Sequence, residues 1–127
     1  MASETILLAD DEQVVRSVLR PMLEHGGYHV EEATNGHETV QLVRDTNPDL
    51  VILDLKMPDL NGYSVLLRIK SQASGDDIPI IVLSGEFVGD EYREHSEELG
   101  AIRHLEKPVG QQKLLRVVQE AIAERPG

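Results

Sequence analysis

The sequence contains no cysteine and no tryptophan, and only 3% of its residues are aromatic, so a folded core must be mainly aliphatic. Without cysteine, the chain can form neither a disulfide framework nor thiolate metal ligands, which fits a reducing compartment. No stretch approaches the roughly 18 apolar residues that a membrane span needs, and residues 1–9 lack the basic start of a secretion signal. These absences predict a cytoplasmic protein that is neither exported nor inserted into a membrane.

Positive charge is also scarce. The chain has 12 Lys and Arg residues against 23 Asp and Glu residues, which gives a formal net charge of −11. Because nucleic acids are bound through clustered Lys and Arg side chains, we expect no direct contact with DNA or RNA. Low-complexity tracts, internal repeats and linkers are missing as well, and 127 residues are enough for one domain but not for two of ordinary size.

What the sequence does contain is a strand-like run followed by a helical pattern, five times over. The apolar strand-like runs occupy residues 5–10, 28–33, 49–54, 78–84 and 101–107. Between them, apolar residues recur at the spacing of an amphipathic helix, most clearly after residue 110. Alternating strands and helices without hairpin signals predict an α/β fold with a parallel sheet covered by helices on both faces.

The texture of the runs predicts the order of the strands. Residues 5–9, 50–53 and 80–83 are continuously apolar, as expected for central strands that are buried on both faces, whereas 28–33 and 101–107 mix apolar and polar residues as edge strands do. With right-handed crossovers, the doubly wound, flavodoxin-like order 2-1-3-4-5 places these two runs outside. It also puts a ligand-binding switch point between strands one and three.

Polar side chains stand where four of the five strands end. Strand one closes on Asp10 and Asp11, strand three on Asp54, strand four on Ser84 and strand five on Lys107. Carboxylates that share one edge of a sheet raise each other's pKa unless a cation favours their charged forms. Magnesium, which is bound by carboxylate and phosphate oxygens, meets this need, and three acids, one dication and one ammonium group sum to zero.

The acidic pair Asp10-Asp11, the segment 54–62 (DLKMPDLNG), the hydroxyl of Ser84 and the pair Lys107-Pro108 together resemble the receiver domain of bacterial two-component response regulators. The resemblance keeps the order and spacing of these motifs and covers about residues 4–124. It therefore identifies residues 1–127 as a single receiver domain.

The resemblance implies a phosphoacceptor switch rather than an enzyme that turns over an external substrate. Asp54 would accept a phosphoryl group from a phosphohistidine on a sensor histidine kinase or a histidine phosphotransfer protein, and the domain would assist only its own phosphorylation and dephosphorylation. The implied ligands of Mg²⁺ or Mn²⁺ are Asp10, Asp11, Asp54 and the backbone carbonyl of Lys56. Ser84 and Lys107 would hold the phosphoryl oxygens, as expected of a reaction that depends on positioning and charge stabilisation.

The same resemblance implies how the signal leaves the domain. Ser84 and the residue at position 104 form the switch, but receivers usually carry Tyr or Phe where this sequence has His104, so a full swing of the side chain is not assumed. The fourth helix, fifth strand and fifth helix would form the output surface for a downstream protein or an attached output domain. This surface is also a candidate for homodimerisation. The peptide bond between Lys107 and Pro108 is expected to be cis.

Three alternatives remain open at this point. Asp10 or Asp11 could simply cap the helix that follows. Lys56 and Glu86, each two residues beyond a site residue, could pair and restrict the water that hydrolyses the acyl phosphate, or could be two solvated charges. Finally, the chain could be a pseudo-receiver that binds proteins without phosphorylation. An aspartate-nucleophile phosphatase is disfavoured, because Lys56 stands where those enzymes resemble each other in having a second acid.

Overall fold

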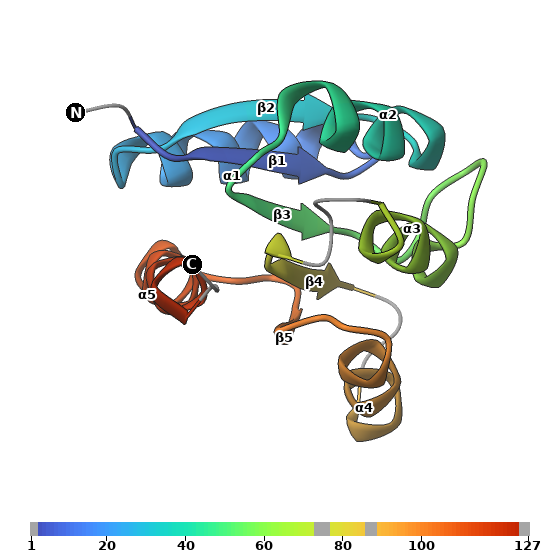
Figure 1. Ribbon diagram of the computed structural model, residues 1–127. Coiled ribbons are helices and arrows are strands. Elements are labelled where there is room, and N and C mark those ends of the chain that lie inside the picture. Colours follow the sequence, from blue (N-terminus) through green and yellow to red (C-terminus); the bar gives the residue numbers. More distant parts are fainter. Residues whose placement is uncertain (1–2, 73–76, 86–88, 125–127) are drawn as a thin grey trace.

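The computed structural model describes residues 3–72, 77–85 and 89–124, in which strands and helices alternate (Figure 1). The strands are β1 (Thr5–Ala9), β2 (His29–Ala33), β3 (Leu50–Leu53), β4 (Ile80–Ser84) and β5 (Arg103–Glu106). The helices are α1 (Gln13–His25), α2 (Gly36–Thr46), α3 (Gly62–Lys70), α4 (Asp90–Glu98) and α5 (Gln111–Glu124). The predicted rhythm of five strand and helix pairs is thus confirmed.

The five strands form one parallel sheet in the order β2-β1-β3-β4-β5. Every residue of the central strands β3 and β4 is buried, whereas the edge strands β2 and β5 each expose one or more residues. The sequence predicts this difference between central and edge strands, because a strand that is covered on both faces must be apolar on both faces. The predicted doubly wound α/β fold and its strand order are correct.

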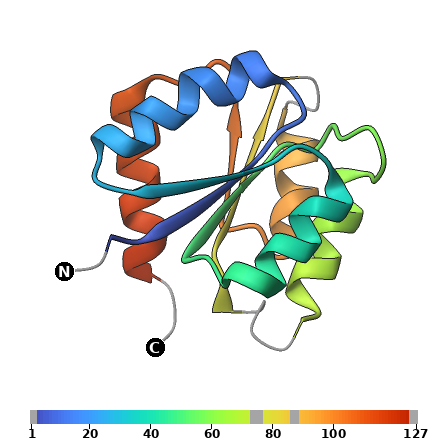
Figure 2. The ribbon, with the colours of Figure 1, turned by 90° about the horizontal axis from the view of Figure 1, so that it is seen from above.

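The helices cover the sheet in two layers. Figure 2 shows α1 and α5 on one face and α2, α3 and α4 on the other. Each layer has its own apolar cluster: one joins the sheet to α1 and α5, and the other joins it to α2 and α3. The predicted apolar face of the last helix is confirmed by its buried residues Leu114, Val117, Val118 and Ala121. In the part of the chain that the structure describes, no helix is long and apolar enough to cross a membrane.

Backbone hydrogen bonds continue one residue beyond three of the strands at the carboxyl edge of the sheet, which we call the rim. The N–H of Asp10 donates to the carbonyl of Ala33 (3.1 Å), and the N–H of Asp54 donates to the carbonyl of Ala9 (2.9 Å). Likewise, the N–H of Lys107 donates to the carbonyl of Ser84 (2.8 Å). The sheet itself therefore fixes the backbone of the polar residues that follow its strands.

Candidate functional site

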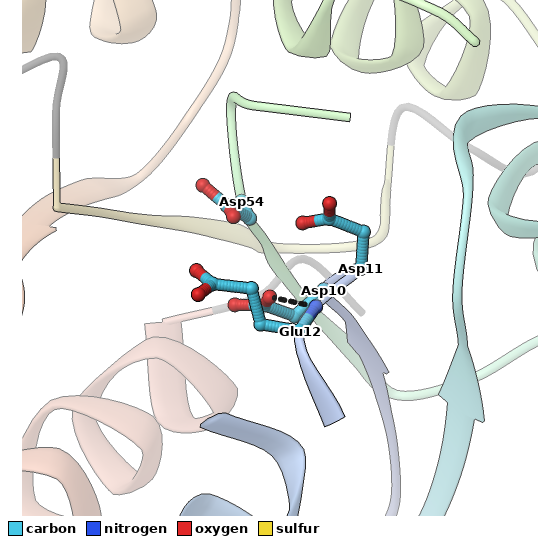
Figure 3. Close-up of side chains that lie close together, drawn as sticks. All are labelled: Asp10, Asp11, Glu12 and Asp54. Atoms are coloured by element: carbon cyan, nitrogen blue, oxygen red, sulfur yellow. Dashed lines mark hydrogen bonds between the residues drawn. The ribbon is translucent and has the colours of Figure 1, made fainter. Parts of the chain in front are cut away.

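Four acidic side chains meet at the rim. Ligand oxygens of Asp10, Asp11, Glu12 and Asp54 all lie within 4.8 Å of one another, and Figure 3 shows these side chains converging from the ends of β1 and β3. Asp10 and Asp54 are buried, with 2% and 4% of their surface exposed, whereas Asp11 and Glu12 are open to solvent. The predicted convergence of Asp10, Asp11 and Asp54 is thus present in the structure, and Glu12 joins it.

Lys107 brings a positive charge to the same place. Its Nζ lies 2.8 Å from Asp10 Oδ2, 3.3 Å from Asp54 Oδ2 and 3.7 Å from Glu12 Oε1. Burial alone would lower the pKa of Lys107, but the hydrogen bond to Asp10 and the charge of Asp54 outweigh it and raise that pKa. The lysine is therefore held as an ammonium group between two buried carboxylates. The peptide bond between Lys107 and Pro108 is cis, as expected from the sequence.

Asp54 is the acid whose charge is least favoured. Burial raises the pKa of Asp54 to about 6, and the charge of Asp10 adds to this, while the N–H of Lys56 and the ammonium group of Lys107 act in the opposite direction. The N–H of Lys56 donates to Asp54 Oδ1 over 3.2 Å. At neutral pH the carboxyl group is thus mostly ionised while remaining shielded from solvent, a state suited to a nucleophile.

The remaining predicted site residues occupy the expected elements. Ser84 is buried and is the last residue of β4, and the side chain of Lys56 is exposed beside Asp54. Glu86, the proposed partner of Lys56, lies outside the described residues, so their pairing stays a prediction.

His104 is buried on β5 and reaches α4. Its Nδ1 lies 2.9 Å from Oγ of Ser96, a fully buried residue of α4. The Ser96 hydroxyl also lies 3.0 Å from the carbonyl of Tyr92, to which it donates. The hydroxyl group of Ser96 thus contacts both a backbone carbonyl of its own helix and the ring of His104. The predicted switch residue His104 is thus tied to α4, a contact that the sequence did not suggest.

Asp59 links the loop after Asp54 to the start of α2. Its carboxylate accepts hydrogen bonds from the N–H groups of Gly36 (2.7 Å) and His37 (3.0 Å) and lies 2.6 Å from Nδ1 of His37. Partial desolvation opposes the charged form, but the N–H groups of His37 and Gly36 hold the pKa of Asp59 well below its usual range. The loop that carries Lys56 is therefore anchored to the second helix.

Glu12 is not among the site residues that the sequence predicts. The helix begins at Gln13, and Glu12 is its N-cap residue without a capping bond from its side chain. Nor does Asp10 cap the helix in the usual way: Asp10 Oδ1 accepts from the N–H of Glu12 (2.9 Å), which holds the turn between strand and helix. The signal for Glu12 was its place directly after the acidic pair.

The donors at the rim fit a hard divalent cation. All four are carboxylates, and oxygen ligands of this kind suit Mg²⁺ and Mn²⁺. With Glu12 included, four carboxylates, one ammonium group and one dication leave a formal charge of −1 rather than the predicted zero. The extra acid makes the rim more attractive to a cation than the sequence suggested.

Known proteins resemble this chain in sequence and in structure. The family model for the response regulator receiver domain matches residues 6–119. The response regulator MprA of Mycolicibacterium vanbaalenii is 40% identical over 110 residues, which are 87% of this chain and 46% of that protein. This chain spans about half the length of the curated relatives that it matches.

Two solved structures extend the comparison. A response regulator from Chloroflexus aurantiacus superposes with a TM-score of 0.90 at 30% identity, covering 97% of this chain and 100% of that one. The receiver domain of a sensor histidine kinase from Pseudomonas aeruginosa superposes with a TM-score of 0.88 at 31% identity, with the same coverage, and was solved with a magnesium ion coordinated in its active-site cleft.

Proposed function

The chain belongs to the response regulator receiver domain family, and from this premise we propose that it is a phosphoacceptor switch of a two-component phosphorelay, with Asp54 as the acceptor. The observation that carries the proposal is the meeting of the buried Asp54 with Lys107 and three further acids at one edge of the sheet. A buried carboxylate beside both a lysine and a cation-type donor set is what acceptance of a phosphoryl group requires.

The residues present fit a magnesium or manganese ion. Asp10, Asp11, Asp54 and the backbone carbonyl of Lys56 would hold it, and Glu12 stands near enough to contribute. When bound, the cation would offset the charge of the carboxylates and of the incoming phosphoryl oxygens. In the Pseudomonas aeruginosa receiver domain such an ion is magnesium.

The chemical step that this geometry serves is an in-line displacement. A carboxylate oxygen of Asp54 attacks phosphorus, the bond between phosphorus and the histidine nitrogen breaks, and the imidazole leaves with the electron pair. Lys107 and Ser84 would hold the phosphoryl oxygens as negative charge spreads over them. Hydrolysis then returns the carboxylate and inorganic phosphate, so the domain acts on its own acyl phosphate and turns over no other substrate.

An apolar groove beside Lys107 supports docking of the phosphodonor. Val14 and Val18 of α1 are 74% and 50% exposed, and with Pro108 and Val109 they line a groove of about 200 Å³ that reaches Lys107. Contiguous exposed apolar surface of this kind is typical of a protein contact site. We assign this groove to a sensor histidine kinase or histidine phosphotransfer protein, which would bring its phosphohistidine to the rim.

The output would pass through the face formed by α4, β5 and α5. Phosphorylation can shift this face only if the phosphoryl group binds better to one arrangement of Ser84, Lys107 and His104 than to another. The partner would be a downstream protein, a covalently attached output domain or a second copy of the chain. The net charge of −11 speaks against nucleic acid as a direct partner of this domain, and we place its action in the cytoplasm.

The proposal is tested by phosphorylation of the purified protein. Incubation with acetyl phosphate and Mg²⁺ should add one phosphoryl group, detected by intact-protein mass spectrometry, and Asp54→Asn should abolish the addition. Asp45→Asn is the matched control, because Asp45 is an exposed acid of α2 and is not part of the acidic group at the rim. If the wild type gains no phosphoryl group from acetyl phosphate or from any sensor kinase, the chain is a pseudo-receiver that binds proteins without phosphorylation.

A further inference from the structure

Arg16 of α1 has no part in the proposed phosphoryl transfer, but it binds both β2 and the backbone of Asp10. Its Nε donates to Glu32 Oε1 on β2 over 2.7 Å, and its Nη1 donates to the backbone carbonyl of Asp10 over 2.6 Å. Only 12% of the Arg16 side chain is exposed. We propose that Arg16, oriented by Glu32, is a positioning residue for the metal-binding acids of the rim. This inference rests on the proposed function, since it assigns a role at the same site.

The contacts of Asp10 show why Arg16 matters there. The N–H of Asp10 donates to Ala33, Oδ1 accepts from the N–H of Glu12 and Oδ2 accepts from Lys107. The carbonyl of Asp10 belongs to the peptide that continues into Asp11, and Arg16 holds this carbonyl. Asp11 is exposed, so the orientation of that peptide determines where its carboxylate stands.

Glu32 holds Arg16 in the orientation that lets it bind the Asp10 carbonyl. Its two oxygens are each taken by one arginine of α1, Oε1 by Arg16 and Oε2 by Arg20 (2.6 Å). The hydrogen bonds from Arg20 and Arg16 outweigh partial burial and lower the pKa of Glu32, so it stays ionised. A paired Arg16 is held in one orientation, and its charge, which alone would repel a dication, is neutralised. The pair therefore contributes geometry to the rim rather than positive charge.

A purely structural ion pair between α1 and β2 is the competing explanation, and Arg20 separates the two. Arg20 donates to the same Glu32 and also to Glu24 (3.2 Å), but the carbonyl of Asp10 is bound by Arg16. Loss of either arginine weakens the attachment of α1 to β2. Only loss of Arg16 should alter the acids of the rim.

The experiment is a Mg²⁺ titration of the full, metal-free chain, followed by isothermal calorimetry and by the amide NMR shifts of Asp11 and Asp54. Residues that orient metal ligands typically change metal affinity by about 10- to 100-fold, so we expect Arg16→Gln to raise the Kd for Mg²⁺ at least about tenfold. Arg20→Gln should leave it within about twofold. Removing a cation near a dication site would by itself tighten binding, so the expected weakening cannot come from lost charge.

Arg16→Lys keeps the positive charge, but lysine lacks the planar guanidinium group with which arginine binds Glu32 and the Asp10 carbonyl at the same time. It should weaken Mg²⁺ binding as well, and it decides the question if Arg16→Gln does not fold. A wild-type Kd in each folded Arg16 variant, or equal weakening in Arg20→Gln, would overturn the inference. So would a wild type that binds no Mg²⁺. A wild type that binds Mg²⁺ normally yet accepts no phosphoryl group would instead refute the proposed function and leave the role of Arg16 standing.

Discussion

The helices α4 and α5 pack beside the last strand on opposite faces of the sheet (Figure 2). They are attached by different forces. Four residues of α5 are buried in the apolar cluster shared with α1. In α4 the one buried residue is Ser96, which is polar. Its attachment includes the hydrogen bond between Ser96 and His104 and an edge-to-face contact between the rings of His95 and Tyr63, whose centroids are 4.4 Å apart.

This difference bears on which helix can move. Apolar burial is non-directional and must be given up over a large area before a helix is released. A hydrogen bond contributes only about 1 kcal/mol net and depends on direction, so a small displacement breaks it. We therefore expect α4 to change position at low cost while α5 stays fixed. If phosphorylation is sensed through Ser84 and His104, α4 is the element of the output face that would shift most easily.

The largest expected effect on stability concerns α5, the helix that is attached by apolar burial. Leu114 is fully buried on α5, and Leu→Ala substitutions in cores typically cost about 2 to 5 kcal/mol. Leu114→Ala should lower the free energy of unfolding by this amount, measured by urea denaturation. Leu115→Ala is the control, because Leu115 is only partly buried, and this substitution should cost clearly less. Similar losses in the two variants would mean that burial does not hold α5.

A smaller and more local effect is expected from Ser96→Ala. The substitution leaves the buried Nδ1 of His104 without its hydrogen-bond partner on Ser96, which costs about 1 to 3 kcal/mol. Hydrogen exchange followed by mass spectrometry should show faster exchange in α4 and little change in α5. Ser17→Ala is the matched control for Ser96→Ala, because the Ser17 hydroxyl also donates to a carbonyl of its own helix but is exposed. Exchange that rises equally in both helices would contradict the contrast.

The fold was predictable because a strand buried on both faces of the sheet has apolar residues at successive positions. The apolar runs at Leu50–Leu53 and Ile80–Ser84 revealed the central strands, and their order then placed Asp54 between the acids after β1 and the lysine after β5. Asp10, Asp54, Ser84 and Lys107 were found because each directly follows or ends a strand, and Asp11 because it is paired with Asp10. Their meeting at one edge of the sheet could therefore be predicted from their position along the chain.

The contacts that join elements through single side chains could not be read in this way. Arg16 binds Glu32 and Asp10, and Ser96 meets His104, but a serine within the acidic α4 gives no sign of being buried. Hydrogen bonds between side chains have no periodicity, and they depend on how helices are rotated on the sheet. The rotation is fixed by packing over the whole layer, which no short motif encodes.

The smallest expected effect comes from ionisation of Asp54 at the rim. Because the rim belongs to neither helix, this effect tests whether the difference in attachment between α4 and α5 is local. Asp54 has a pKa of about 6 in the folded, metal-free protein, against 3.8 for an ordinary aspartate. A raised carboxyl pKa stabilises the folded state below the ordinary pKa, and this contribution is lost as the pH rises through about 6. Asp54→Asn cannot ionise, so its stability relative to the wild type should rise between about pH 4.5 and pH 7 in a chelating buffer.

At about 1.4 kcal/mol per pKa unit, the rise from 3.8 to about 6 sets an upper limit of about 3 kcal/mol. Part of this change falls below pH 4.5, and relaxation of the protein and water around a buried charge reduces it further, so we expect a rise of about 1 kcal/mol in urea denaturation. Because Asp54 follows the central strand β3, its ionisation acts on unfolding of the whole domain. Amides of α4 and α5 that exchange through global unfolding should therefore respond equally to this pH change. A response confined to α4 would show instead that the charge of Asp54 already reaches the fourth helix without a phosphoryl group, and that the polar attachment of α4 is part of the site.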